Sequence, residues 1–166
     1  MNTKYLKDLQ NRAEAGDPSK QAELGKMYYK GEGVPRHYET ATDWFLKAAE
    51  QNFVEAEFYL GKMYFEDKVV QDKNSEEIKQ RKAKHWLKQS ADIHGFADAQ
   101  LYLGKKLEEN GDHVGAYKWY SLATAQGSED ARVNLDVLEK CMSRKDVTEA
   151  QKDAASWHWR DEHAVS

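Results

Sequence analysis

Apolar residues recur along this chain at the spacing of an amphipathic helix, in paired segments that polar turns connect. In the first segment of one such pair, the apolar positions are Ala56, Leu60, Met63 and Tyr64. In the second segment of the preceding pair, they are Ala41, Trp44, Phe45, Ala48 and Ala49. Residues three and four apart share one face of a helix, so each segment predicts a helix with one buried stripe. Runs that alternate apolar and polar residues are absent, and the pattern therefore predicts an all-α protein.

The helix pairs repeat along the chain. The sequence LGKMY at 24–28 returns unchanged at 60–64, and LGKKL follows at 103–107. An Ala-x-x-Trp motif follows each copy and also closes a degenerate fourth copy. Its tryptophans are Trp44, Trp86, Trp119 and Trp157. Repetition at such intervals is typical of solenoids, in which stacked hairpins bury stripes that no single hairpin can cover. We therefore predict a solenoid of antiparallel helix pairs.

The glycine of each LGK motif lies inside a predicted helix, where it costs about 1 kcal/mol relative to alanine. These glycines are Gly25, Gly61 and Gly104. A missing Cβ lets a neighbouring helix approach closely, and a bulky side chain on that helix can fill the adjacent space. We interpret the tryptophans of the Ala-x-x-Trp motif as those side chains. Glycines and tryptophans are thus predicted to be structural positions of the repeat.

The combined pattern, A-x-x-x-L-G-x-M-Y, then G-x-G-V, then A-x-x-W-x-x-x-A-A, resembles Sel1-like repeats, which are relatives of tetratricopeptide repeats. The matching residues are Leu24, Gly25, Met27, Tyr28, Gly31, Gly33, Val34, Trp44, Ala48 and Ala49 in the first copy and Ala56, Leu60, Gly61, Met63 and Tyr64 in the second. Lys20 and Lys106 depart from the pattern. The resemblance implies a right-handed superhelix whose first helices line the concave side. It also implies a role in assembling protein complexes rather than in catalysis.

Residues 1–166 are expected to form a single solenoid domain and a complete small protein. Its predicted parts are a capping helix at 1–16, repeats at 17–52, 53–95 and 96–127, and a degenerate capping repeat at 128–166. The second repeat carries an insertion within 66–82, either a solvated connection that binds nothing or the one irregular projection that a partner recognises. Asn74 and Glu77 predict a capping box for the helix after it.

Composition narrows the possible functions. Lysine and arginine number 25 against 29 acidic residues, a formal net charge of −4. This balance lacks the basic surplus of a nucleic-acid binder. No apolar run approaches the roughly 20 residues that span a bilayer, and the N-terminus lacks the apolar stretch of a secretory signal. We expect a soluble, monomeric protein of the bacterial cytoplasm, with no nucleic-acid or membrane partner.

Motifs for catalysis or for a cofactor are missing from the sequence. Metal, phosphate and Ca²⁺ motifs do not occur, and neither does S-x-x-K or the paired cysteines of Sel1 relatives linked to β-lactam binding. His158 and His163 are five residues apart and fall on different helix faces, which disfavours a metal site. Cys141 has no evident base nearby and is expected to be a small buried residue. We predict no cofactor, no metal and no enzymatic activity.

Two positions of each first helix are not used by the packing motif, and they nominate a binding surface. The position two residues before the glycine holds Glu23, Tyr59 and Tyr102 in the three repeats. The position one residue after it holds Lys26, Lys62 and Lys105. The two positions are three apart and share a helix face. Tyrosine offers rigid contact area and lysine steers an acidic partner, so this stripe suits an acidic, partly apolar protein segment. The alternative is that the lysines only solubilise an exposed face.

Three functions remain open from the sequence. The favoured one is a protein-interaction scaffold or adaptor that binds a partner on the concave face. The second is a stoichiometric inhibitor, such as an immunity protein that blocks a toxin. The third is a binder of a small molecule or cell-wall fragment, or an enzyme, that uses the superhelical groove. Fold alone does not separate them.

Overall fold

A computed structural model describes residues 3–69 and 72–156 of the chain. Within these residues all regular structure is helical, which confirms the predicted all-α class. The chain divides into two compact units, residues 1–89 and 90–166. The organisation into one domain with three repeats and two caps stays a prediction.

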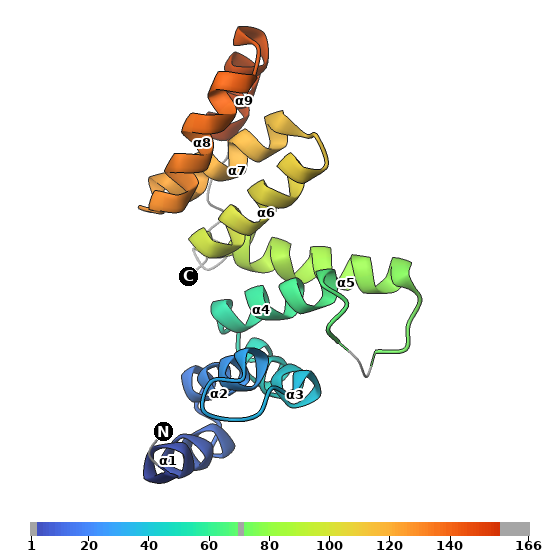
Figure 1. Cartoon of the computed structure of the whole chain (residues 1–166), viewed down its shortest axis with the longest axis vertical. Helices are drawn as coiled ribbons and strands as arrows, with labels where there is room; N and C mark the ends of the chain where they lie inside the picture. The colour runs from blue at the N-terminus through green and yellow to red at the C-terminus, as the bar shows by residue number, and fades with distance from the viewer. Residues whose placement is uncertain (1–2, 70–71, 157–166) are drawn as a thin grey trace, which may run out of the picture. The chain divides into compact units, whose positions relative to one another are not determined.

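The first unit is a succession of helices in which each packs against the next (Figure 1). The helices are α1 (Thr3–Glu14), α2 (Pro18–Lys30), α3 (Tyr38–Ala49), α4 (Val54–Phe65) and α5 (Glu76–Lys88). Helices α2 and α3 form one hairpin and α4 and α5 form the next, as the repeat pattern predicts. Alanine-rich apolar residues of α2 to α5 build its main core, and Leu9, Ala13, Leu24 and Met27 join α1 to α2.

The second unit is organised around one helix. It follows a π-helical turn, η1 (Gln89–Ile93), and contains α6 (Ala97–Glu109), α7 (His113–Ala125), α8 (Glu129–Cys141) and α9 (Arg144–Ser156). Helix α7 packs against α6, α8 and α9. In this last copy α9 packs mainly against α7 rather than against α8, and Asp136 of α8 occupies the position that holds glycine in the other first helices.

Local signals fix the ends of α2. Asp17 caps the start, because its carboxylate accepts the backbone N–H groups of Ser19 and Lys20 at 3.1 and 3.2 Å. Pro18 follows at the first helical position, where its missing N–H costs nothing. Gly31 ends the helix with φ of 78°, a left-handed conformation that glycine adopts without strain. The first LGK motif thus lies on a helix whose two ends are fixed by Asp17 and Gly31.

The glycines of the three LGK motifs mark the closest approach within each hairpin. A Cβ built on Gly25 would lie 2.8 Å from the ring of Phe45, one on Gly61 would lie 2.7 Å from Leu87, and one on Gly104 would lie 2.5 Å from Tyr120. No side chain fits at such distances. The predicted close approach is therefore present in all three hairpins.

The side chain that fills the space is not the predicted one. Phe45, Leu87 and Tyr120 each follow the tryptophan of the Ala-x-x-Trp motif by one residue, and all three are buried. Trp44, Trp86 and Trp119 are only half-buried. Consecutive residues point about 100° apart around a helix, so only one of the two can face the glycine. Trp44 instead packs against the cluster that joins α1 to α2. Trp157 lies outside the described residues.

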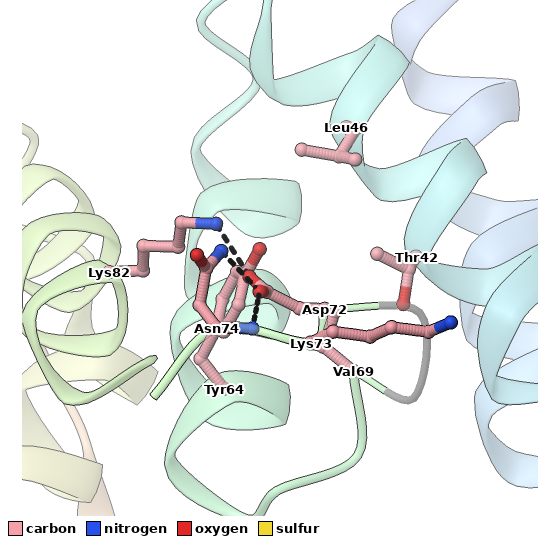
Figure 2. Close-up of a pocket in the computed structure, with 8 residues that line it drawn as sticks. All are labelled: Thr42, Leu46, Tyr64, Val69, Asp72, Lys73, Asn74 and Lys82. Atoms are coloured by element: carbon pink, nitrogen blue, oxygen red, sulfur yellow. Dashed lines mark hydrogen bonds and ion pairs between the residues drawn. The ribbon is translucent and has the colours of Figure 1, made fainter. Parts of the chain in front are cut away.

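The described part of the insertion packs onto the first unit. Val69 is buried in the main core, and the Asp72 side chain is only 6% exposed. Lys82 of α5 donates to this carboxylate at 2.5 Å, and the Asn74 backbone N–H donates at 3.0 Å (Figure 2). The predicted capping box is wrong: α5 begins after Ser75, and the Asn74 side chain bonds to Asp72 instead. The connection is therefore anchored at Val69 and at Asp72.

Replacing Asp72 by alanine is expected to lower the free energy of unfolding by about 2 kcal/mol, because the hydrogen bonds to a nearly buried charge are lost. The hydrogen bond from Lys82 holds the pKa of Asp72 below its usual 3.8. This contribution is therefore complete above pH 3.8 and disappears as the pH falls below that value. Urea denaturation at pH 7 measures the loss, with Asp43→Ala on an exposed site as the control. Equal stability of the two variants would contradict the anchoring.

Candidate protein-binding surface

Side chains link the first helices of the first two repeats. Lys26 of α2 forms an ion pair with Glu55 of α4, with 2.9 Å between Nζ and Oε1. Further along the same helices the Tyr29 hydroxyl donates to the Glu66 carboxylate at 3.0 Å. Residues of α2 and α4 therefore form one continuous surface within the first unit.

An aromatic cluster lies at the centre of this surface. Tyr59 stacks on Phe45 with ring centroids 4.9 Å apart and an interplanar angle of 3°. The same ring meets Tyr29 nearly edge-on at 5.5 Å, and Tyr29 also lies 5.9 Å from Tyr38. Because Tyr59 is half-buried by these contacts, it serves the packing of the hairpins as well as the surface.

Ammonium groups surround the cluster. Lys62 Nζ lies 5.7 Å from the centroid of Tyr29, and Lys68 Nζ lies 4.9 Å from it. Lys68 also pairs with Glu66 at 2.6 Å. The negative faces of tyrosine rings attract such cations. The surface thus combines aromatic contact area with positive charge at its edge.

Glu23 and Lys26 border a cavity of about 510 Å³ beside α2. The Tyr5 hydroxyl of α1 donates to Glu23, and Lys20 pairs with Glu23 at 2.8 Å. Burial opposes ionisation of Glu23, but the hydrogen bonds from Lys20 and Tyr5 outweigh it and hold the pKa below its ordinary value. Glu23 is therefore an ionised, internally bonded side chain, less suited than the lysines to contact an acidic partner.

The third pair of nominated residues lies on α6 in the second unit. Tyr102 is half-buried, and Lys106 Nζ lies 5.7 Å from the centroid of its ring. Lys105 is exposed. A stripe that runs through all three repeats stays a prediction, as does partner binding by any of the six nominated residues.

Several residues of this surface could not be nominated from the two repeat positions alone. Tyr29, Tyr38, Glu66 and Lys68 all contribute, yet none stands two before or one after a repeat glycine. The doubled tyrosine in KMYYKG at 26–31 could have drawn attention to Tyr29. Lys68 could not have been found, because its place follows from the path of the insertion.

The remaining candidate residues concern metal binding and cysteine chemistry. Among residues 3–69 and 72–156, no group of three or more histidine, cysteine, aspartate or glutamate residues is arranged to hold a metal ion. Cys141 is exposed in the last turn of α8, which corrects the expectation that it is buried. His158 and His163 lie outside the described residues.

In the part of the chain that the structure describes, no helix is both long and apolar enough to cross a bilayer.

Comparison with known proteins addresses the resemblance directly. The family model described as Sel1 repeat matches residues 21–53, 54–93 and 97–128. A solved structure of c5321, described as a protective antigen present in uropathogenic Escherichia coli strains and displaying an SLR fold, is 30% identical with a TM-score of 0.66. That match covers 89% of this chain but only 33% of c5321, so this chain spans about a third of that protein's length.

A second similar structure is a Sel1 repeat protein from Oxalobacter formigenes. It is 33% identical with a TM-score of 0.56, and the match covers 79% of this chain and 96% of that one. The curated proteins yielded no match. The family model accounts for three consecutive helix pairs and more than half of the residues, and both solved structures are Sel1-type repeat proteins. The chain therefore belongs to the Sel1 repeat family.

Proposed function

We propose that this protein is a non-catalytic scaffold that binds a segment of a partner protein across α2 and α4, the first helices of its first two repeats. Sel1 repeats generally mediate protein–protein interaction. The observation that carries the proposal here is the surface of α2 and α4. There Tyr29 packs against Tyr59 and lies near the ammonium groups of Lys62 and Lys68, and Lys26 pairs with Glu55 on the same helices. Aromatic area with positive charge at its edge suits an acidic, partly apolar segment.

The contacts within the surface suggest how a partner binds. Lys26 and Lys68 are already paired with Glu55 and Glu66, so a partner carboxylate that reaches them shares or replaces an existing ion pair. Such exchanges contribute little net affinity at an exposed site. Affinity is therefore expected to come mainly from contact with the tyrosines, while the lysines determine the rate and specificity of association.

Charge reversal on the first helices tests the proposal. Lys26→Glu with Lys62→Glu is expected to reduce partner capture from a host lysate at least about tenfold, because both changes oppose an acidic segment. The control carries Lys47→Glu with Lys84→Glu on the second helices α3 and α5, where both lysines are exposed. Captured proteins are quantified by mass spectrometry after circular dichroism has shown equal helicity.

Capture that is equally strong with both double variants would contradict a site on the first helices. The same experiment addresses the inhibitor alternative, because a single partner bound tightly in a one-to-one ratio is typical of an inhibitor rather than an adaptor. Capture of no protein by the wild type would contradict the scaffold itself.

A further inference from the structure

A second cavity lies beside the insertion, where α3, Tyr64 of α4 and Lys82 of α5 also border it. It is a shallow depression that is open to solvent, with a volume of about 430 Å³. Figure 2 shows Leu46 of α3 on one side of it and Asp72 and Asn74 of the insertion on the other. Residues from a helix and from a connection far along the chain thus border one space.

The insertion side of this cavity is held in place. Val69 is buried beneath it, and Asp72 receives hydrogen bonds from Lys82 and Asn74. Lys82 therefore neutralises the negative charge of Asp72. Their hydrogen bond lowers the pKa of the Asp72 carboxyl and raises the pKa of the Lys82 amine. A wall with its own charges already paired does not need to rearrange when a ligand binds.

One charge of the lining differs from the others. Lys73 is exposed, and no hydrogen bond or ion pair to it is found among residues 3–69 and 72–156. Its side chain runs from the insertion towards α3 in Figure 2. Leu46, which is half-buried, supplies apolar surface to the same cavity. The lining thus includes one positive charge without a partner among the described residues and one aliphatic side chain.

We propose that this cavity binds a partner segment in which a carboxylate stands next to an aliphatic side chain. The carboxylate pairs with Lys73, and the aliphatic side chain packs against Leu46. A basic segment is disfavoured because Lys73 and Lys82 would repel it and the Asp72 carboxylate is already occupied. This inference rests on the proposed scaffold function and specifies the chemistry of a second contact with the partner.

A dipeptide probe tests the cavity without the unknown partner. N-acetyl-Leu-Asp-amide is titrated into the ¹⁵N-labelled full chain, with N-acetyl-Leu-Asn-amide and N-acetyl-Leu-Lys-amide as comparison probes. We expect saturable shifts of the Leu46 and Asn74 amide signals with a dissociation constant of about 1 mM, a typical value for so small a ligand. The neutral and basic probes are expected to bind at least about fivefold more weakly.

Variants assign the effect to Lys73. Lys73→Glu is expected to abolish the shifts, whereas Lys84→Glu, which reverses an exposed charge of α5 outside the lining, leaves them unchanged. Absence of saturable shifts up to about 10 mM, or equal binding by Lys73→Glu and the wild type, would overturn the proposal. Neither result affects the scaffold function, which depends on capture of the partner by the first helices.

Discussion

Replacing Phe45 by alanine is expected to lower the free energy of unfolding by about 3–5 kcal/mol, the usual effect of removing a fully buried aromatic side chain. Phe45 is 0% exposed, fills the space beside Gly25 and stacks on Tyr59. Trp44→Ala, one residue earlier, is expected to cause a smaller loss despite the larger side chain, because Trp44 is only half-buried. Urea denaturation followed by circular dichroism compares the two variants.

The order of these two losses separates the observed packing from the one that the sequence suggested. If the tryptophan were the main packing partner of the glycine, Trp44→Ala would be the more damaging change. A larger loss for Trp44→Ala would thus contradict the packing described above.

Glu57→Gln is expected to stabilise the protein at alkaline pH by up to about 3 kcal/mol. Glu57 is 1% exposed, and burial raises its pKa to about 7 from an ordinary value of 4.5. A raised pKa means that the unfolded state ionises first, so the stability of the wild type falls as the pH rises from 4.5 to 7. The difference between the two pKa values corresponds to about 3 kcal/mol above pH 7.

The other repeats show why glutamine suits this position. Gln21, Glu57 and Gln100 each lie four residues before a repeat glycine, and all three are buried. Gln21 donates from Nε2 to the carbonyl of Ala13 at 3.0 Å, and Gln100 donates to that of Ala91 at 3.1 Å. An amide can donate in this way at any pH, whereas an ionised carboxylate cannot.

Unfolding free energies of the wild type and Glu57→Gln at pH 4.5, 6 and 8 measure the effect. The two proteins are expected to converge at pH 4.5 and to diverge as the pH rises. Glu50→Gln, at an exposed site, controls for the loss of one negative charge. A wild type that is as stable as Glu57→Gln at pH 8 would show that the buried carboxyl carries no such penalty.

The helix pairs could be predicted from the sequence because their signals are local. Apolar spacing of three and four residues, together with glycine and proline turns, indicates helices wherever it occurs, and the repeats reinforce one another. Neighbouring positions within a helix are harder to assign. Trp44 is more conspicuous than Phe45, but a difference of about 100° around the helix decides which of them meets Gly25.

The candidate site was predictable only in part. Lys26, Tyr59 and Lys62 were nominated by their repeat positions, and they do lie on the neighbouring helices α2 and α4 of the first unit. Glu55 pairs with Lys26, whereas Glu66 and Lys68 contact Tyr29, and these contacts join segments that are distant in sequence. The ion pair between Asp72 and Lys82, which anchors the insertion, was equally hard to predict. The two residues are ten apart, one before α5 and one within it, and no sequence pattern pairs such positions.

The central structural claim is that a glycine in α2, α4 and α6 makes room for the residue that follows the tryptophan. A double-mutant cycle of Gly25→Ala and Phe45→Ala tests it most directly. In the wild type Gly25→Ala is expected to lower the free energy of unfolding by about 1–3 kcal/mol, because the new methyl overlaps the Phe45 ring. In the Phe45→Ala background the same change is expected to be neutral or stabilising, since the methyl enters vacated space and alanine favours the helix by about 1 kcal/mol. An equal loss from Gly25→Ala in both backgrounds would contradict the claim.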